Sequence, residues 1–116
     1  MEANGTAADP VVIRGLNRTP GYWNGIELDH TNSAGFTHTV VTDFGSTEPL
    51  SPLGAAFNLL ESFLILDNVT ISNGIGDGIK CDNPSIFDDG SFIRFISNVQ
   101  ITGITGVMVE PECNNF

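Results

Sequence analysis

The sequence has very few positive charges. Four Lys and Arg stand against fourteen Asp and Glu, which gives a formal net charge of −10 over 116 residues. Four cations cannot form the positive stripe that binds nucleic-acid phosphates or an anionic membrane. We therefore expect no nucleic-acid partner and no membrane insertion. An acidic, lysine-poor surface is typical of secreted proteins, of proteins that bind divalent cations or neutral glycans, and of an ordinary solvated surface.

Long apolar runs and cysteine clusters are also missing. No stretch approaches the roughly 18 apolar residues that cross a bilayer. The residues after Met1, Glu2-Ala3-Asn4-Gly5, do not resemble a signal peptide. Two cysteines, Cys81 and Cys113, form neither a disulfide framework nor a recognisable metal-binding spacing. These features decide neither the compartment nor the redox state of the two thiols.

What is abundant is turn-forming chemistry. The chain has 13 Gly and 6 Pro, together with many Asn, Asp, Ser and Thr. These residues favour tight turns over helices, while 41% of the residues are apolar, enough to build a core. We predict an all-β protein of short strands and many turns.

Four tetrapeptides share one pattern, in which a glycine is followed by an apolar, a variable and an apolar residue. The starts are 29 (25 to 54), 24 (54 to 78) and 28 (78 to 106) residues apart. Alternate apolar residues indicate strands with one buried face. The tetrapeptides are Gly25-Ile26-Glu27-Leu28, Gly54-Ala55-Ala56-Phe57, Gly78-Ile79-Lys80-Cys81 and Gly106-Val107-Met108-Val109.

A second series of segments repeats at the same interval. It consists of Thr39-Val40-Val41-Thr42, Asn68-Val69-Thr70-Ile71 and Asn98-Val99-Gln100-Ile101, each preceded by an apolar residue at Phe36, Ile65 or Phe95. Such a unit leaves backbone hydrogen-bonding groups open on both sides, so it is stable only when stacked on its neighbours. We predict a right-handed parallel β-helix, a solenoid of about four short coils of three strands.

The predicted domain spans residues 1–116, with coils beginning near 25, 54, 78 and 106 and a partial coil over 1–24. The inward columns expected from the alignment are Ile26, Ala55, Ile79 and Val107; Leu28, Phe57, Cys81 and Val109; Val40, Val69 and Val99; and Phe36, Ile65 and Phe95. Asn68 and Asn98 occupy equivalent turns. We expect them to form a structural amide ladder with Thr39 as its end member.

Two segments resemble a known family. The opening GTAADPVVIRG with TPGYWNGIEL, and the later LDNVTISNGIGDGI, resemble the β-helix repeat domain of bacterial secreted and surface proteins, which has a pectate-lyase-like architecture. The resemblance covers most of the chain from about Gly5 to Val109. It implies a secreted or cell-surface protein and is specific for architecture rather than for any activity.

Two sets of residues are candidate binding sites. Tyr22 and Trp23 follow a Pro-Gly turn and form an aromatic pair that can either stack on a sugar ring or pack at a coil corner. Residues four positions after each coil glycine are expected to stack outward at about 4.8 Å, where oxygen ligands suit Ca²⁺. The candidate metal ligands are Asp29, Asn58, Asp82 and Glu110, with Asp88 and Asp89 in a neighbouring loop.

No catalytic residue emerges from the sequence. Asp77 in Gly76-Asp77-Gly78 faintly resembles the acidic strand of polygalacturonases, but no second carboxylate lies beside it, and a turn-closing role is favoured. The best interpretation is a non-catalytic β-helical binding or scaffold module with glycan as ligand. The alternative is a Ca²⁺-assisted polysaccharide lyase or glycoside hydrolase.

The ends of the predicted stack point to self-association. A solenoid presents an open strand edge at each end, and no amphipathic capping helix is evident in the sequence. We expect a homodimer or larger species formed through these ends.

Overall fold

The computed structural model describes residues 2–29, 34–46, 54–60, 62–82 and 92–109. The described chain is entirely β, with no helix among these residues. One sheet, called sheet A, has the strand order β1-β4-β6-β8, with β2 also paired to β4, and sheet C has the order β3-β5-β7. The bounds are β1 Glu2–Asn4, β2 Val11–Ile13, β3 Ile26–Asp29, β4 Ala34–Thr42, β5 Ala55–Leu60, β6 Phe63–Gly74, β7 Asp77–Asp82 and β8 Phe92–Ile104.

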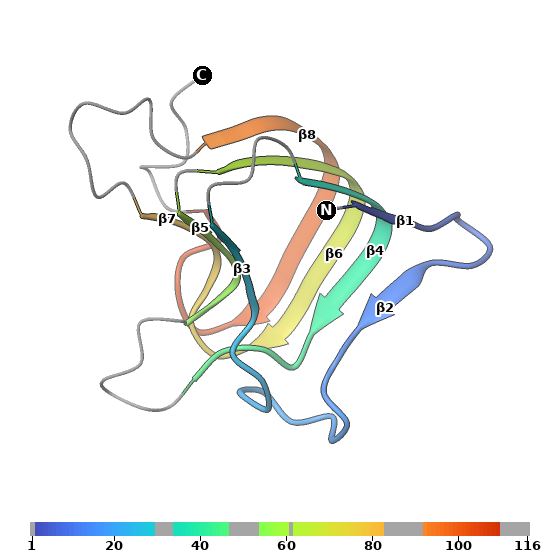
Figure 1. The fold of residues 1–116 in the computed structure, drawn as a ribbon. Coiled ribbons are helices and arrows are strands. Elements are labelled where there is room, and N and C mark those ends of the chain that lie inside the picture. The colour runs from blue at the N-terminus through green and yellow to red at the C-terminus, as the bar shows by residue number, and fades with distance from the viewer. Residues whose placement is uncertain (1, 30–33, 47–53, 61, 83–91, 110–116) are drawn as a thin grey trace.

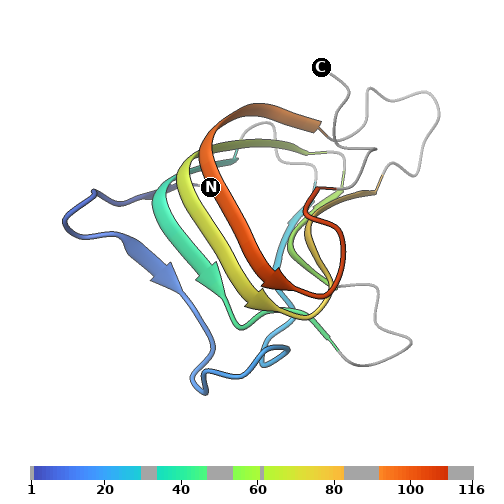
Figure 2. The ribbon, with the colours of Figure 1, turned by 180° about the vertical axis from the view of Figure 1, so that it is seen from behind.

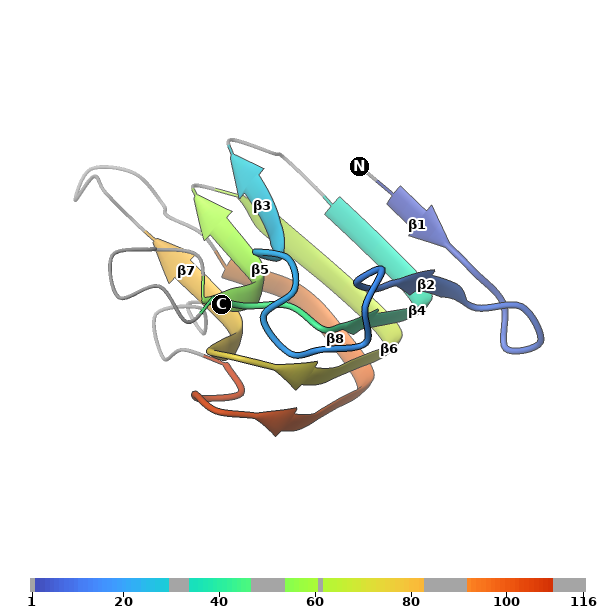
Figure 3. The ribbon, with the colours of Figure 1, turned by 90° about the horizontal axis from the view of Figure 1, so that it is seen from below.

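Every pair of neighbouring strands is parallel. From β3 onward the chain alternates between the two sheets, so that each strand pairs with the strand two places later in the sequence. Figure 1 shows β4, β6 and β8 as curved strands side by side, and Figure 2 shows the same three from behind. In Figure 3 the strands β3, β5 and β7 form the second layer, opposite sheet A.

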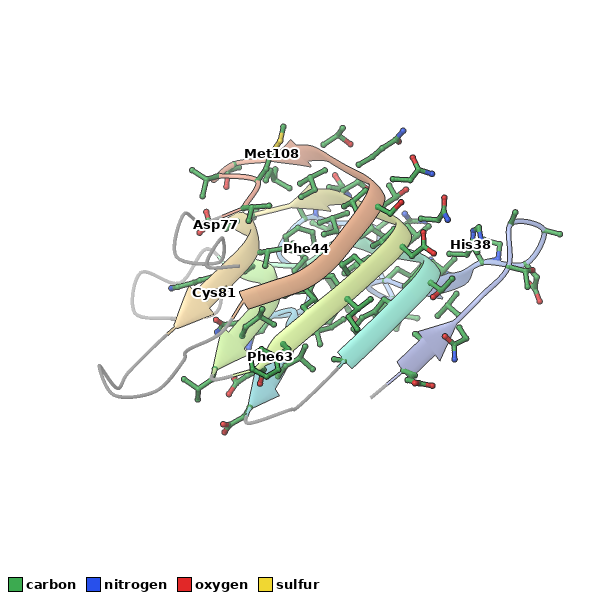
Figure 4. The ribbon with its side chains drawn as sticks, turned by 90° about the horizontal axis from the view of Figure 1, so that it is seen from above. His38, Phe44, Phe63, Asp77, Cys81 and Met108 are labelled. Atoms are coloured by element: carbon green, nitrogen blue, oxygen red, sulfur yellow. The ribbon has the colours of Figure 1, made fainter. Side chains whose placement is uncertain are left out.

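The core lies between the two sheets because alternate side chains of both sheets point inward. Phe36 on β4 meets Phe57 on β5 edge to face, with ring centroids 4.8 Å apart. Phe44 is also fully buried and lies between the layers in Figure 4. The other large, fully buried side chains are Leu59, Leu64, Leu66, Ile71, Ile79, Val41, Val69 and Thr39.

The register of β4 differs by one residue from the sequence alignment. Thr39 pairs with Val69 and Val41 with Ile71, so Val40 lies opposite Thr70 and is only partly buried. The predicted inward position of Val40 is therefore wrong, whereas Val69 and Val99 do pair. Since side chains alternate between faces, a slip of one residue exchanges the inward and outward sets.

The corner before these pairs explains the slip. His38, Asn68 and Asn98 all have left-handed backbone, with φ of 46°, 56° and 52°. The flanking pairs align the three residues on consecutive strands. His38, not Thr39, is thus the end member of the predicted ladder. The alignment missed it because it matched Val40 to Val69 and Val99 and so placed Thr39, rather than His38, level with the two asparagines.

The other predicted columns also need correction. Phe36 pairs with Leu66 rather than with Ile65, although Ile65 does pair with Phe95. In sheet C, Ile26 pairs with Phe57 and Phe57 with Ile79, so Ala55 does not share their column. A loop of different length before β5 moved the apparent repeat by two residues.

The predicted start at Gly54 belongs to a different column from Gly25. The pairs of β5 with β3 and β7 place Gly25 beside Ala56 and then Gly78, whereas Gly54 aligns with Gly76. Gly106 also belongs with Gly76, because its N–H donates to the Gly76 carbonyl at 2.8 Å. The glycines of the repeat thus occupy two positions that lie two residues apart, one shared by Gly25 and Gly78 and the other by Gly54, Gly76 and Gly106.

The C-terminal members of the predicted columns shift accordingly. Val109 bridges to Ile79, not to Cys81 as the alignment proposed. Val107 is 52% exposed rather than inward. Cys81 pairs with Leu59, and it is buried and disulfide-bonded. Cys113, the only other cysteine in the sequence, lies outside the described residues.

Candidate functional site

The outward face of sheet A carries polar side chains in registered rows, and we call it the outer face. Strand pairing places Val40, Thr70 and Gln100 in one row. Two flanking rows contain Thr37, Asp67 and Ser97, and Ser72 with Thr102, while Thr42, which begins the last row on β4, is buried. Thr70 is partly exposed and Gln100 is exposed. Because adjacent strands lie about 4.8 Å apart, the rows bring hydroxyl, amide and carboxylate groups close together over three strands.

The ladder at the corner adds side-chain amides to this face. Asn98 Nδ2 donates to Asn68 Oδ1, and Asn68 Nδ2 donates in turn to Asp67 Oδ1 at 2.9 Å. His38 occupies the equivalent corner of β4, and Figure 4 shows it on the side of the molecule where the N-terminal strands lie. The predicted structural role of Asn68 and Asn98 is confirmed. Their hydrogen-bonding groups are partly used by one another.

A second polar centre surrounds Asp43 and was not foreseen from the sequence. Its carboxylate is fully buried and forms an ion pair of 2.8 Å with Nε of Arg18, whose side chain is 58% exposed. Oδ1 accepts from Asn73 Nδ2 at 2.7 Å and from Thr42 Oγ1 at 3.2 Å. Oδ2 also accepts from the backbone N–H of Gly15 at 3.3 Å.

These partners determine the protonation of Asp43. Burial raises the pKa of the carboxyl. Hydrogen bonds from Asn73, Arg18 and Thr42, together with the guanidinium charge, lower it by more than burial raises it, so the pKa lies below its ordinary value of 3.8. The charged carboxylate therefore ties the N-terminal segment to the ends of β4 and β6. Every side-chain oxygen is committed to a structural partner, so Asp43 stabilises this corner rather than serving as a reactive group.

The aromatic pair lies at this corner, and its two members differ. Trp23 donates its indole N–H to the Thr42 carbonyl at 2.8 Å and packs against the core. That geometry is the packing role that the sequence offered for Trp23 as the alternative to stacking on a sugar ring. Tyr22 is 46% exposed, while its backbone N–H donates to the Asp43 carbonyl at 3.0 Å. The backbone of Tyr22 is thus held beside the residue that follows β4.

The predicted acidic column is not formed as expected. Asp29 pairs with Leu60, and Leu60 pairs with Asp82, so an apolar residue separates the two aspartates. Asn58 belongs to another row, opposite Glu27 and Lys80. The same two-residue shift of β5 that displaced Gly54 separates Asn58 from Asp29. The predicted stacking of Asp29, Asn58 and Asp82 on one another is therefore wrong.

The remaining metal candidates, Glu110, Asp88 and Asp89, lie outside the described residues. Within the part of the chain that the structure describes, no three His, Cys, Asp or Glu side chains gather in a way that could hold a metal ion. Nor does any helix of these residues have the length and apolarity to span a membrane.

Asp77 has a structural partner of its own. Its Oδ1 accepts from the backbone N–H of Val107 at 3.0 Å, and the N–H of Asp77 donates to the Gly54 carbonyl. Figure 4 shows Asp77 at the start of β7. Its carboxylate thus links β7 to the segment that follows β8. These two hydrogen bonds join neighbouring strand layers. They do not close the turn from Gly74 to Gly78, which is the role that the sequence predicted for Asp77.

Comparisons with known proteins add no relative. No protein-family model, no curated protein and no solved structure matches the chain.

Proposed function

We propose that the chain is a right-handed parallel β-helix that acts as a non-catalytic scaffold and binds a glycan on the outer face. The observation that carries the proposal is the registered set of rows on β4, β6 and β8. Hydroxyl and amide groups both donate and accept hydrogen bonds, which suits the hydroxyl groups of a sugar. A rigid parallel sheet presents these groups at fixed spacing, which reduces the entropy lost on binding.

Tyr22 supplies an aromatic surface at one end of the same face. An exposed tyrosine ring can pack on the apolar side of a sugar ring while its hydroxyl stays in water. Its neighbours Asp43 and Arg18 are occupied by their ion pair, so they hold the corner in place and leave recognition to Tyr22 and the polar rows. A neutral glycan is favoured, because the chain's net charge of −10 repels anionic polysaccharides.

A secreted or cell-surface location fits this function. The disulfide of Cys81 supports it, since structural disulfides persist mainly in oxidising compartments. The resemblance to β-helix repeat domains of bacterial surface proteins points the same way.

The test is glycan-array screening of the intact chain, followed by calorimetric titration with the best ligand. The double variant Tyr22→Ala/Thr70→Ala should weaken binding at least about 10-fold, because it removes the aromatic surface and a central hydroxyl. The matched control is Glu27→Ala on the exposed side of sheet C, which should bind as the wild type does. Equal binding by the double variant would contradict the outer face as the site.

A second measurement separates a binder from an enzyme. Polysaccharides from the array are incubated with the protein, with and without millimolar Ca²⁺, and their chain length is followed by chromatography. A non-catalytic module leaves the chain length unchanged. Ca²⁺-dependent shortening would overturn the proposal in favour of a lyase or hydrolase, and a Ca²⁺-dependent rise in melting temperature would show that the folded chain binds Ca²⁺.

A further inference from the structure

The two ends of the layered structure are built differently. At the N-terminal end, the edge of β4 is covered by two strands of three residues each, β1 along Gly35–Thr37 and β2 along Thr39–Val41. The Arg18–Asp43 ion pair and the indole of Trp23 close the adjoining corner. Short edge strands with flanking charge are a common way to prevent strands of other chains from pairing.

The opposite end has none of these features among the described residues. β8 is 13 residues long, and within the described part of the chain it pairs only with β6. Among these residues, nothing pairs with the backbone N–H and C=O groups of its other edge. In sheet C the outermost layer is formed by residues 107–109. The Val107 and Met108 carbonyls accept from Gly78 and Ile79 at 3.0 Å. β8 and residues 107–109 together form what we call the β8 end.

Beyond Arg94 the β8 end is uncharged, and it is partly apolar. Residues 97–109 contain no Asp, Glu, Lys or Arg, in a chain whose net charge is −10. Met108 is 60% exposed and projects outward in Figure 4, and Val107 is 52% exposed. Val99, Ile104 and Val109 are only partly buried and pack against the core from this side. Exposed apolar side chains beside an open strand edge are a characteristic of an interaction surface.

We propose that a second copy of this chain docks on the β8 end, with the two β8 strands pairing antiparallel across a two-fold axis. The charge distribution identifies the occupant, because two copies with a net charge of −10 each can approach closely only through a neutral surface. Head-to-tail stacking is disfavoured, because the edges at the N-terminal end are only the short strands β1, β2 and β3, of 3, 3 and 4 residues. One long open edge per chain therefore favours a closed, two-fold dimer.

This inference deepens the proposed scaffold function, because it assumes the same stacked sheets and assigns one end of them to assembly. In the dimer the two outer faces would form parts of one assembly, so that a single polysaccharide can engage two sites. Such bivalent binding strengthens attachment without new contacts at either site.

The test is sedimentation velocity on the full chain and on two matched variants. Met108→Glu places a carboxylate opposite its copy in the dimer, whereas Leu16→Glu makes the same kind of change at a side chain that is 84% exposed near the N-terminal end. We expect a wild-type dimer, a dimer dissociation constant raised at least about 10-fold by Met108→Glu, and an unchanged constant for Leu16→Glu. Thr102→Lys, at an exposed position of β8, should act as Met108→Glu does.

Three outcomes would overturn the inference: a folded wild-type monomer at about 100 μM protein, a greater effect of Leu16→Glu than of Met108→Glu, or no inter-chain contacts at β8 in isotope-filtered NMR spectra of a mixed labelled and unlabelled sample. Far-ultraviolet circular dichroism checks that each variant is folded. Glycan binding by a folded monomer would remove only the dimer, whereas a dimer that binds no glycan would remove only the glycan-binding proposal.

Discussion

Asn73 Nδ2 lies 2.7 Å from Oδ1 of Asp43 and donates a hydrogen bond to it. The backbone N–H of Asp43 donates in return to the Asn73 carbonyl at 3.0 Å. Both residues have left-handed backbone, with φ of 66° and 56°. The pair therefore joins the corners of β4 and β6 through both side chain and backbone.

Replacing Asp43 should strongly destabilise the protein. Asp43→Ala leaves the Asn73 amide and the Gly15 N–H without their buried acceptor and removes the ion pair with Arg18, which should lower the free energy of unfolding by about 3 kcal/mol. Asp43→Asn keeps an oxygen acceptor and tolerates left-handed backbone, so it should cost about half as much. Urea unfolding followed by circular dichroism measures both. Equal losses for the two variants would argue against the hydrogen-bond network.

Acidification should remove the contribution of Asp43. Its pKa is lower in the folded protein than the roughly 3.9 of an unfolded aspartate. The carboxylate therefore stabilises the fold fully above that value, and the stabilisation disappears as pH falls through the folded pKa. The difference in unfolding free energy between wild type and Asp43→Asn should be constant from about pH 7 down to about pH 5 and shrink below about pH 4. A difference that does not change with pH would contradict the assignment.

The corner at Asn68 should depend on backbone conformation as well as on its amide. Asn68→Ala must hold a φ of 56° without the side chain that favours it and loses the bonds to Asp67 and Asn98. We expect a loss of about 1–2 kcal/mol in unfolding free energy. Asn68→Gly adopts this φ freely and should recover part of the loss. Thr70→Ala, two residues along the strand, should change stability by less than about 0.5 kcal/mol.

Gly45 and Gly35 form a contrasting pair. Gly45 has a φ of 108°, and a Cβ at this position would overlap the carbonyl oxygen of Ile75 on the neighbouring layer. A Cβ on Gly35 meets no atom within 4 Å. Gly45→Ala should lower the free energy of unfolding by about 2–4 kcal/mol, while Gly35→Ala should be neutral or stabilise by up to about 1 kcal/mol. Thermal and urea unfolding compare the two, and a tolerated Gly45→Ala would show that the layers separate more easily than described.

Reduction should weaken the fold. Cys81 is disulfide-bonded and Cys113 is the only other cysteine, so the native protein should show no reactive thiol in a colorimetric assay, before or after denaturation. Cys81→Ser, or a reducing agent, should lower the free energy of unfolding by about 2–4 kcal/mol. The double variant Cys81→Ser/Cys113→Ser should behave as reduced wild type does. Two titratable thiols in the freshly purified protein would refute the assignment.

Some of the fold was accessible to sequence reasoning because it depends on local signals. Alternation of apolar residues identified the strands around Ile26, Val69, Ile79 and Val99. The repeated Asn-Val step correctly aligned Asn68 with Asn98, since an asparagine at a tight corner has a specific backbone preference. The all-β class followed from the turn-rich composition, and parallel pairing followed from the repeat interval.

Register and long-range polar contacts were decided only by tertiary structure. Val40 was misplaced because the alignment matched valines instead of the corner residues His38, Asn68 and Asn98, whereas Gly54 was misplaced because the repeat interval is 57 − 26 = 31 residues from β3 to β5 but 79 − 57 = 22 from β5 to β7. An alignment of apolar residues cannot tell a one- or two-residue shift from a true repeat when both faces contain apolar residues. Because Gly54 was aligned two residues away from its true position, Asp29 and Asn58 were predicted to share a column, although they lie in different rows.

Composition and local pattern by themselves determined that this is a β protein with an acidic, lysine-poor surface, and that its strands repeat. Packing of the two sheets decided which side chains face the core, buried Asp43 among partners as far away in sequence as Asn73, and left residues 97–109 as an uncharged layer at one end. The physical reason is that strand formation depends on neighbouring residues, whereas pairing partners and buried charges depend on contacts between segments far apart in the sequence.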